Sequence, residues 1–249
     1  DKTVEKLLDD PWGALEHITA LRIHLARGSA VFLLASVGAF MYAQELLDWF
    51  TGPIGGIDKL LAVEVTEPIS VFMRISLLTG FAISLPYIIL ELWLFVAPGI
   101  ISIRSRWLGL FSIPFITLLF VGGMAFAFYV MLKPALGVLI GFLEIPHSPR
   151  PASYMKFVTN LMFWIGIAFE FPIVIGLLAA MGLVRAEVLL QQTRIIVVGL
   201  AVVAAAATPT VDPVNMMIVW GPLVGLYFFG LGIAFVIQYF RDRRQKAQA

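Results

Sequence analysis

The chain has 249 residues, of which 60% are hydrophobic and only 13% charged, and its mean hydropathy is +0.95. Soluble globular domains carry about 25% charged residues, so this composition excludes that class and indicates a membrane protein with several spans. The formal net charge of +1 gives no indication of a nucleic-acid partner, and the sequence contains no Cys and only three scattered His residues. Neither a disulfide, a metal site nor a cofactor is therefore expected, and no nucleophile or phosphate-binding loop points to an enzyme.

The first half of the chain is predicted to cross the membrane three times. A charged amphipathic segment leads into a first span at about 28–43, and a Gly/Pro-rich loop follows at 51–59. The second span is expected at about 69–97. The third is expected at about 107–132, where two adjacent glycines permit close helix packing.

A long loop region is predicted before the fourth span. Lys133 and Pro134 are expected to open it, and the Pro-rich segment 144–154 is expected to close it as loop rather than helix. The fourth span lies within 156–185, which is long enough to cross the hydrocarbon core of a bilayer as a helix.

The last two helices are both expected to be short. The fifth span, 195–207, has too few residues for a full crossing, and the sixth is expected at about 213–238. We therefore predict a single membrane domain: a cytoplasmic amphipathic segment at 1–27, a six-helix bundle at 28–238 and a basic tail at 239–249.

Six spans place both chain ends on one face of the membrane. That face would carry the N-terminal segment, the loops in the 100s and the 180s and the tail, which together hold twelve of the 17 Lys and Arg residues. The loops of the other face are mainly acidic. Because basic loops stay in the cytoplasm, both termini are predicted to be cytoplasmic.

Several short motifs occur in order along the chain. They are HITALRIHL before the first span, Pro53 in the first loop, Thr66-Glu67-Pro68 at the start of the second span, LELWLFVAPGI at its end, FEFP in the fourth span and TPTVDP before the sixth. In order and spacing this set resembles the TatC subunit of the twin-arginine protein translocase. The resemblance implies an all-α integral membrane protein whose six transmembrane helices form a concave, cup-like bundle.

The same resemblance implies a function. A TatC-like core subunit in the bacterial cytoplasmic (inner) membrane would bind twin-arginine signal peptides on its cytoplasmic face. It would assemble with single-span partners of the TatA and TatB type and export folded proteins using the proton-motive force. Assembly into homo-oligomers within the lipid bilayer stays open.

Binding two adjacent arginines favours carboxylates that accept bidentate guanidinium bonds beside an apolar groove. The family carries Glu where this chain has Ala20 and Arg104, so both expected acids are replaced. Glu16 lies one helical turn before Ala20 and Glu91 one turn before Phe95, and both are predicted to compensate. The predicted signal-peptide groove comprises Glu16, Arg22, Glu91, Trp93, Phe95, Pro98 and Arg104.

Plainer interpretations of these groove residues stay open. Glu16 would be a solvated charge, Glu91 would snorkel or pair with a neighbouring base, and Arg22 would anchor the topology rather than orient an acid.

Glu170 is the one ionisable residue in the fourth span, and with Phe169 and Pro172 it forms a predicted intramembrane polar site. An acid at this depth costs a few kcal/mol on insertion scales. The predicted roles are to draw water into the bilayer, to accept a polar group from a partner helix or to relay a proton. The alternative is a protonated acid hydrogen-bonded to a neighbouring helix.

Two further sets of residues are expected to shape the outer side. Thr208, Asp212 and Met216 are predicted to dock a partner helix, with capping of the sixth helix by Asp212 as the alternative. Pro53, Glu67 and Pro68 are predicted to shape an extracytoplasmic cap. Arg74 is expected to snorkel at the outer interface and to meet Glu67 two turns back.

Two other functions stay open on the sequence alone. A divergent TatC-like paralogue would serve as an accessory or assembly subunit without twin-arginine recognition, which the replacements at Ala20, Arg104 and Met216 favour. A proton-coupled small-solute transporter built around Glu170 would need several more polar groups at mid-membrane.

Overall fold

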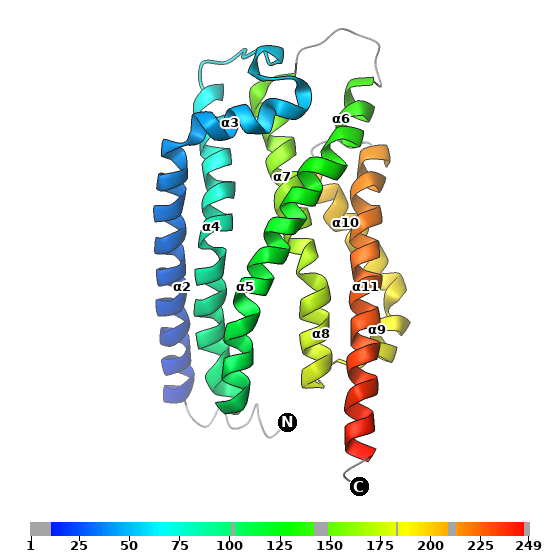
Figure 1. The fold of residues 1–249 in the computed structure, drawn as a ribbon. Helices are drawn as coiled ribbons and strands as arrows, with labels where there is room; N and C mark the ends of the chain where they lie inside the picture. Colours follow the sequence, from blue (N-terminus) through cyan, green and yellow to red (C-terminus); the bar gives the residue numbers. More distant parts are fainter. Residues whose placement is uncertain (1–10, 101–102, 142–148, 183, 209–212, 247–249) are drawn as a thin grey trace. The chain divides into compact units, whose positions relative to one another are not determined.

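The structure is a computed structural model that describes residues 11–100, 103–141, 149–182, 184–208 and 213–246. Within these residues every regular element is helical (Figure 1). The elements are α2 (Pro11–Met41), α3 (Ala43–Thr51), η1 (Gly52–Ile54), η2 (Ile57–Lys59), α4 (Glu67–Ile100), α5 (Ile103–Phe126), η3 (Ala127–Met131), α6 (Leu132–Gly141), α7 (Pro151–Phe169), α8 (Phe171–Met181), α9 (Ala186–Gln191), α10 (Thr193–Ala207) and α11 (Pro213–Lys246). The predicted all-α fold class is confirmed.

Five helical stretches in the described part of the chain are long and apolar enough to cross a membrane. They are Thr19–Met41, Glu67–Phe95, Ile113–Gly137, Pro151–Ala180 and Pro213–Arg241. α10 is a shorter apolar helix of 15 residues, as predicted for the fifth span. The prediction that the sixth helix is also short is wrong, because α11 has 34 residues. A Pro fits the first turn of a helix, and α11 runs from Pro213 through the polar tail to Lys246.

The chain divides into two compact units. The first comprises Asp1–Tyr42 and Ser76–Thr117, and the second comprises Ala43–Ile75 and Leu118–Ala249. Helices α4 and α5 each contribute residues to both units.

The first unit is built on close packing between α2 and the second part of α4. A Cβ atom added to Gly80 on α4 would lie 2.6 Å from the backbone N and Cα of Ser36 on α2. Ser36 is buried and donates its hydroxyl proton to the carbonyl oxygen of Phe32 over 2.8 Å. The Phe32 ring meets the Phe81 ring edge to face, with centroids 6.1 Å apart. Only a residue without a side chain at position 80 permits this approach.

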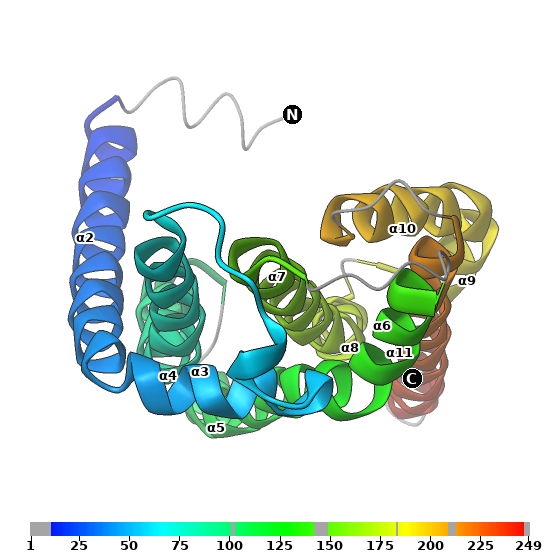
Figure 2. The same cartoon turned by 90° about the horizontal axis from the view of Figure 1, so that it is seen from above.

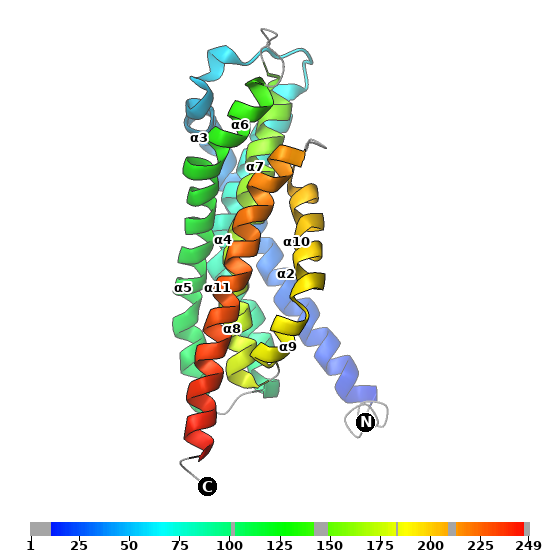
Figure 3. The ribbon, with the colours of Figure 1, turned by 90° about the vertical axis from the view of Figure 1, so that its right-hand side faces the viewer.

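The second unit is centred on α7, which buries one face. Its fully buried side chains include Met155, Leu161, Met162 and Ile165. Tyr154 near the start of α7 donates its phenolic proton to the carbonyl oxygen of Phe50 over 2.8 Å, which ties α3 to α7. Further along the chain, α8 and α10 both pack against α11 (Figure 2 and Figure 3).

One of the two adjacent glycines in α5 makes the close contact that their small size predicts. A Cβ atom at Gly123 would lie 2.8 Å from Cγ of Phe169 and 3.0 Å from Cα of Gly166 on α7. A Cβ atom at Gly122 would meet nothing within 4 Å. α5 and α7 therefore touch at Gly123, whereas Gly122 faces open space.

The predicted loop opening at Lys133 and Pro134 is wrong. The helical path continues from α5 through the π-helical turn η3 into α6, and both residues lie in the first turn of α6. Pro inside a helix lacks an N–H and crowds the carbonyl four residues earlier. The wider π-helical turn directly before Leu132 accommodates this ring.

The loop predicted at 144–154 is also shorter than expected. Residues 142–148 lie outside the described part of the chain, and α7 already begins at Pro151. Pro suits the first helical position because its missing N–H would have no intrahelical partner there. Residues 151–154 therefore form the first turn of α7.

A charged cluster joins the start of α4 to the residue before α7. Arg150 donates from Nε to Oε1 of Glu67 over 2.6 Å and from Nη2 to Oε1 of Glu64 over 2.7 Å. Glu67 is buried, with 2% of its surface exposed, whereas 63% of the Glu64 side chain is exposed. The two carboxylates raise the pKa of the Arg150 guanidinium. The expected partner of Glu67 was Arg74, but Arg74 is exposed and Glu67 binds Arg150 instead.

We expect Gly123→Ala to destabilise the protein by about 1–3 kcal/mol, because overpacking of a tight contact costs that much. Gly122→Ala is the matched control and should leave stability unchanged or slightly higher, since Ala favours a helix over Gly. Thermal unfolding of both variants in detergent measures the difference. Equal unfolding temperatures for the two would contradict the α5–α7 contact.

We expect Arg150→Ala to lower the unfolding temperature more than Glu64→Ala does. Removal of Arg150 leaves the buried Glu67 carboxylate unpaired, which is strongly unfavourable, whereas an exposed ion pair contributes little. A double variant that also carries Glu67→Gln should recover part of the loss. Equal effects of Arg150→Ala and Glu64→Ala would show that the buried carboxylate does not depend on Arg150.

Candidate functional site

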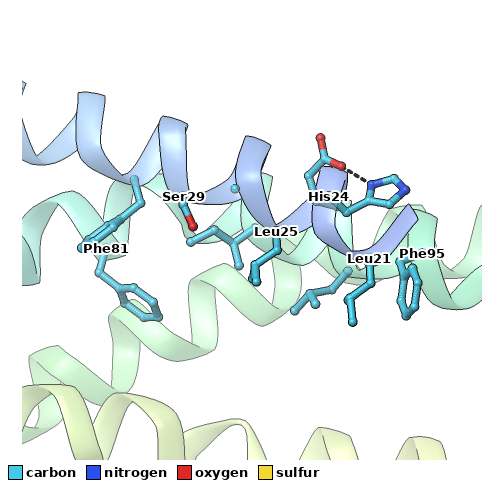
Figure 4. Close-up of a pocket in the computed structure, with 11 residues that line it drawn as sticks. Leu21, His24, Leu25, Ser29, Phe81 and Phe95 are labelled. Carbon is cyan, nitrogen blue, oxygen red and sulfur yellow. Dashed lines mark hydrogen bonds and ion pairs between the residues drawn. The ribbon is translucent and has the colours of Figure 1, made fainter. Parts of the chain in front are cut away.

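Helices α2 and α4 enclose an apolar pocket in the first unit (Figure 4). Its volume is about 200 Å³. The α2 side is formed by residues spaced three and four apart, which share one helix face. The lining residues are Leu21, His24, Leu25, Gly28, Ser29 and Phe32 from α2, and Phe81, Ile88, Glu91, Leu92 and Phe95 from α4.

A buried carboxylate stands at the end of this pocket where His24 lies. Glu91 is 5% exposed, and Nδ1 of His24 binds its Oε2 (dashed line in Figure 4). Tyr87, one turn earlier on α4, also hydrogen-bonds Glu91, and Arg27 on α2 is close enough to attract it. The Phe95 ring meets the His24 ring edge on, with centroids 6.2 Å apart.

The site therefore combines one buried negative charge with a long apolar wall. Among the described residues, no three His, Cys, Asp or Glu side chains gather in a group that could hold a metal ion. The chemistry that the pocket offers is ion pairing with a cation and burial of an apolar segment beside it.

The residues predicted for the groove fall into three groups. Glu91 and Phe95 line the pocket together. Arg22 is exposed and Trp93 half-buried, and neither belongs to the lining. Trp93 follows Glu91 by two positions, and residues so spaced do not share a helix face. The side chains of Glu16, Pro98 and Arg104 lie outside the described part of the structure.

The sequence-based prediction missed two polar lining residues, His24 and Ser29, and of these His24 pairs with Glu91. His24 lies within the motif HITALRIHL and on the same helix face as Leu21 and Leu25. That spacing was available in the sequence. The register that places His24 opposite Glu91, 67 residues later, was not.

Glu170 lies at a break in the fourth span. α7 ends at Phe169 and α8 begins at Phe171, since Pro172 has no N–H to donate to the carbonyl of Ala168. Glu170 is half-buried, and its Oε1 is buried without a hydrogen-bond partner among the described residues. The fourth span is therefore interrupted at Glu170.

Phe169 and Pro172, the neighbours predicted to share the Glu170 site, contact different helices. The Phe169 ring packs near Phe126 of α5, with centroids 5.5 Å apart. Pro172 is buried, and its Cα would lie 3.0 Å from a Cβ atom at Gly230 of α11. The break at Glu170 thus lies where α7 and α8 meet two separate neighbours.

The residues predicted to dock a partner helix lie around the end of α10. Thr208 is buried, and its hydroxyl donates to the carbonyl oxygen of Ala204 over 3.1 Å, closing the last turn of α10. Met216 is half-buried on α11, and Asp212 lies outside the described residues.

Of the predicted cap residues, Glu67 is buried in its ion pair with Arg150, Pro53 is half-buried in η1, and Pro68 is exposed in the first turn of α4. The structure thus connects Glu67 to the segment before α7, and Pro68 contributes mainly to the start of α4.

Comparisons with known proteins agree across most of the chain. The family model described as Sec-independent protein translocase protein (TatC) matches residues 16–222. The TatC protein of Koribacter versatilis is 30% identical over 94% of this chain and 89% of its own length. The chloroplastic TATC of Arabidopsis thaliana is 30% identical over 92% of this chain and 67% of its own length.

Two solved structures share the fold of this chain. A crystal structure described as the twin arginine translocase receptor TatC is 28% identical, covers 89% of this chain and 99% of its own, and superposes with a TM-score of 0.79. A second, in the detergent DDM, has a TM-score of 0.80 at 29% identity. The ordered motifs, the apolar helices and these matches lead to one conclusion: the chain belongs to the TatC family of Sec-independent protein translocase subunits.

Proposed function

We propose that this protein is the signal-peptide receptor of a twin-arginine translocase and binds its ligand in the α2–α4 pocket. The observation that carries the proposal is the buried carboxylate of Glu91 in the wall of an apolar pocket. A solved relative is itself described as a twin arginine translocase receptor.

The ligand chemistry follows from the two parts of the pocket. A guanidinium can form two parallel hydrogen bonds with one carboxylate, and such charge-assisted pairs are about twice as strong as neutral ones. The apolar residues of a signal peptide would lie along Leu21, Leu25 and Leu92, which are all at least 41% exposed although they line the pocket. Burial of such surface contributes roughly 25 cal/mol per Å².

The proposed function also covers where the protein resides, which partners it assembles with and what the complex transports. In the proposal, the protein resides in the bacterial cytoplasmic membrane with the pocket on the cytoplasmic side. It assembles with single-span partners of the TatA and TatB type, and the complex exports folded proteins using the proton-motive force.

A second candidate function keeps the family and drops twin-arginine recognition. The resemblance to the family implies Glu at two positions that this chain fills with Ala20 and Arg104, and a base at position 104 would repel an arginine-rich peptide. In this version the protein is an accessory subunit. Binding of a twin-arginine peptide, compared with its twin-lysine counterpart, separates the two candidates.

We expect Glu91→Gln to weaken binding of a twin-arginine signal peptide by about tenfold or more, because a charged hydrogen bond contributes roughly 1.5–3 kcal/mol and every 1.4 kcal/mol is tenfold in affinity. The purified protein in detergent would be titrated with labelled peptide. Glu45→Gln, on the exposed face of α3, is the matched control and should bind as the wild type does. If the wild type binds neither the twin-arginine nor the twin-lysine peptide, the accessory function is favoured.

We expect Glu170→Gln to abolish or strongly reduce export of a folded twin-arginine reporter while leaving folding intact. Since Oε1 of Glu170 has no hydrogen-bond partner in the described residues, a neutral amide of nearly the same shape should keep or raise the unfolding temperature. Export would be scored in a strain that lacks its translocase core. Wild-type export by the variant would count against any role for Glu170 in transport.

A further inference from the structure

We propose that His24 is a built-in competitor for Glu91 and sets how tightly the pocket binds a cationic peptide. The inference rests on the proposed function, because it concerns the same carboxylate. His24 itself belongs to the pocket wall, and it pairs with Glu91 in the structure without any ligand.

The geometry shows why the imidazole and a guanidinium compete. Nδ1 of His24 binds Oε2 of Glu91, and the hydroxyl of Tyr87 also bonds this carboxylate. A guanidinium that binds in the bidentate manner needs both carboxylate oxygens. His24 already occupies an acceptor site on Oε2, so an arginine competes with the imidazole for this oxygen.

The burial of the two partners indicates which of them moves. The Glu91 side chain is 7% exposed, whereas that of His24 is 22% exposed. Glu91 is held by Tyr87 from its own helix, and Phe95 touches the His24 ring only at its edge. The imidazole can thus rotate toward solvent while the carboxylate stays in the pocket wall.

An exchange of this kind favours arginine over the resident histidine. The guanidinium supplies two bonds in a fixed fork, and the imidazole supplies one. The remaining groups that face Glu91 are Tyr87 from α4 and Arg27 from α2. A carboxylate offers about four acceptor sites, so the Tyr87 hydroxyl can stay bound beside an arginine. Because a ligand has to displace His24 from Glu91, part of the free energy of binding is offset. Cationic ligands that pair only weakly with Glu91 therefore do not displace the histidine.

The test measures peptide affinity in His24 variants of the full chain. His24→Ala should tighten binding of a twin-arginine signal peptide by about 2- to 5-fold, which is the range for losing a partly exposed competing pair. His24→Gln, which keeps a polar side chain without the imidazole ring, should act in the same direction. His24→Arg should weaken binding, because the guanidinium of the new side chain would bind the Glu91 carboxylate more tightly than the imidazole does.

The background variant Glu91→Gln makes the outcomes distinguishable. If His24 acts through Glu91, the His24 substitutions should have no effect in that background. Unchanged or weaker binding in both His24→Ala and His24→Gln, with binding still dependent on Glu91, overturns the inference alone. Binding that does not respond to Glu91→Gln overturns the proposed function and the inference together.

Discussion

The close approach of α2 and α4 at Ser36 and Gly80 is the contact on which the candidate site depends. The missing side chain of Gly80 lets the two backbones touch. His24 and Glu91 form a second contact between the same two helices. His24 lies about three turns before Ser36 on α2, and Glu91 lies about three turns after Gly80 on α4, which is about 17 Å along each helix. The pocket lies between these two points, and most of its lining residues fall within this interval. A side chain at position 80 would separate the helices and alter the distance between His24 and Glu91 as well.

Three carboxylates of this protein illustrate how a membrane chain handles buried acids. Glu67 is compensated by Arg150, from a segment more than 80 residues away. Glu91 is compensated by His24 and Tyr87. Glu170 keeps one oxygen without a partner in the described residues. Because unpaired acids in a bilayer are costly, the pairs of the first two carboxylates offset part of the cost of their burial, whereas Glu170 has a backbone hydrogen bond from Phe120 but no charged partner in the described part of the chain.

Local sequence signals predicted much of the helical pattern. The break at Glu170 follows from Pro172, and the short fifth helix follows from the number of apolar residues in α10. Prolines also caused the two errors of the loop prediction. Pro134 lies within a continuous helical path, and Pro151 starts a helix rather than ending a loop. A proline signals a missing N–H, but whether the chain turns there depends on the neighbouring backbone.

The sequence by itself determined the class of protein, most of its helices and its family, because hydropathy and motif order are properties of neighbouring residues. It also singled out Glu91 and Phe95. Only the tertiary structure decided the partners: Arg150 rather than Arg74 for Glu67, and His24 for Glu91. For Glu91 the physical reason is that a contact between helices depends on their packing register, to which the fit of Gly80 against Ser36 on the same two helices contributes. For Glu67 the reason is that its partner comes from the residue before α7, 83 positions further along the chain. No local spacing in the chain encodes that register.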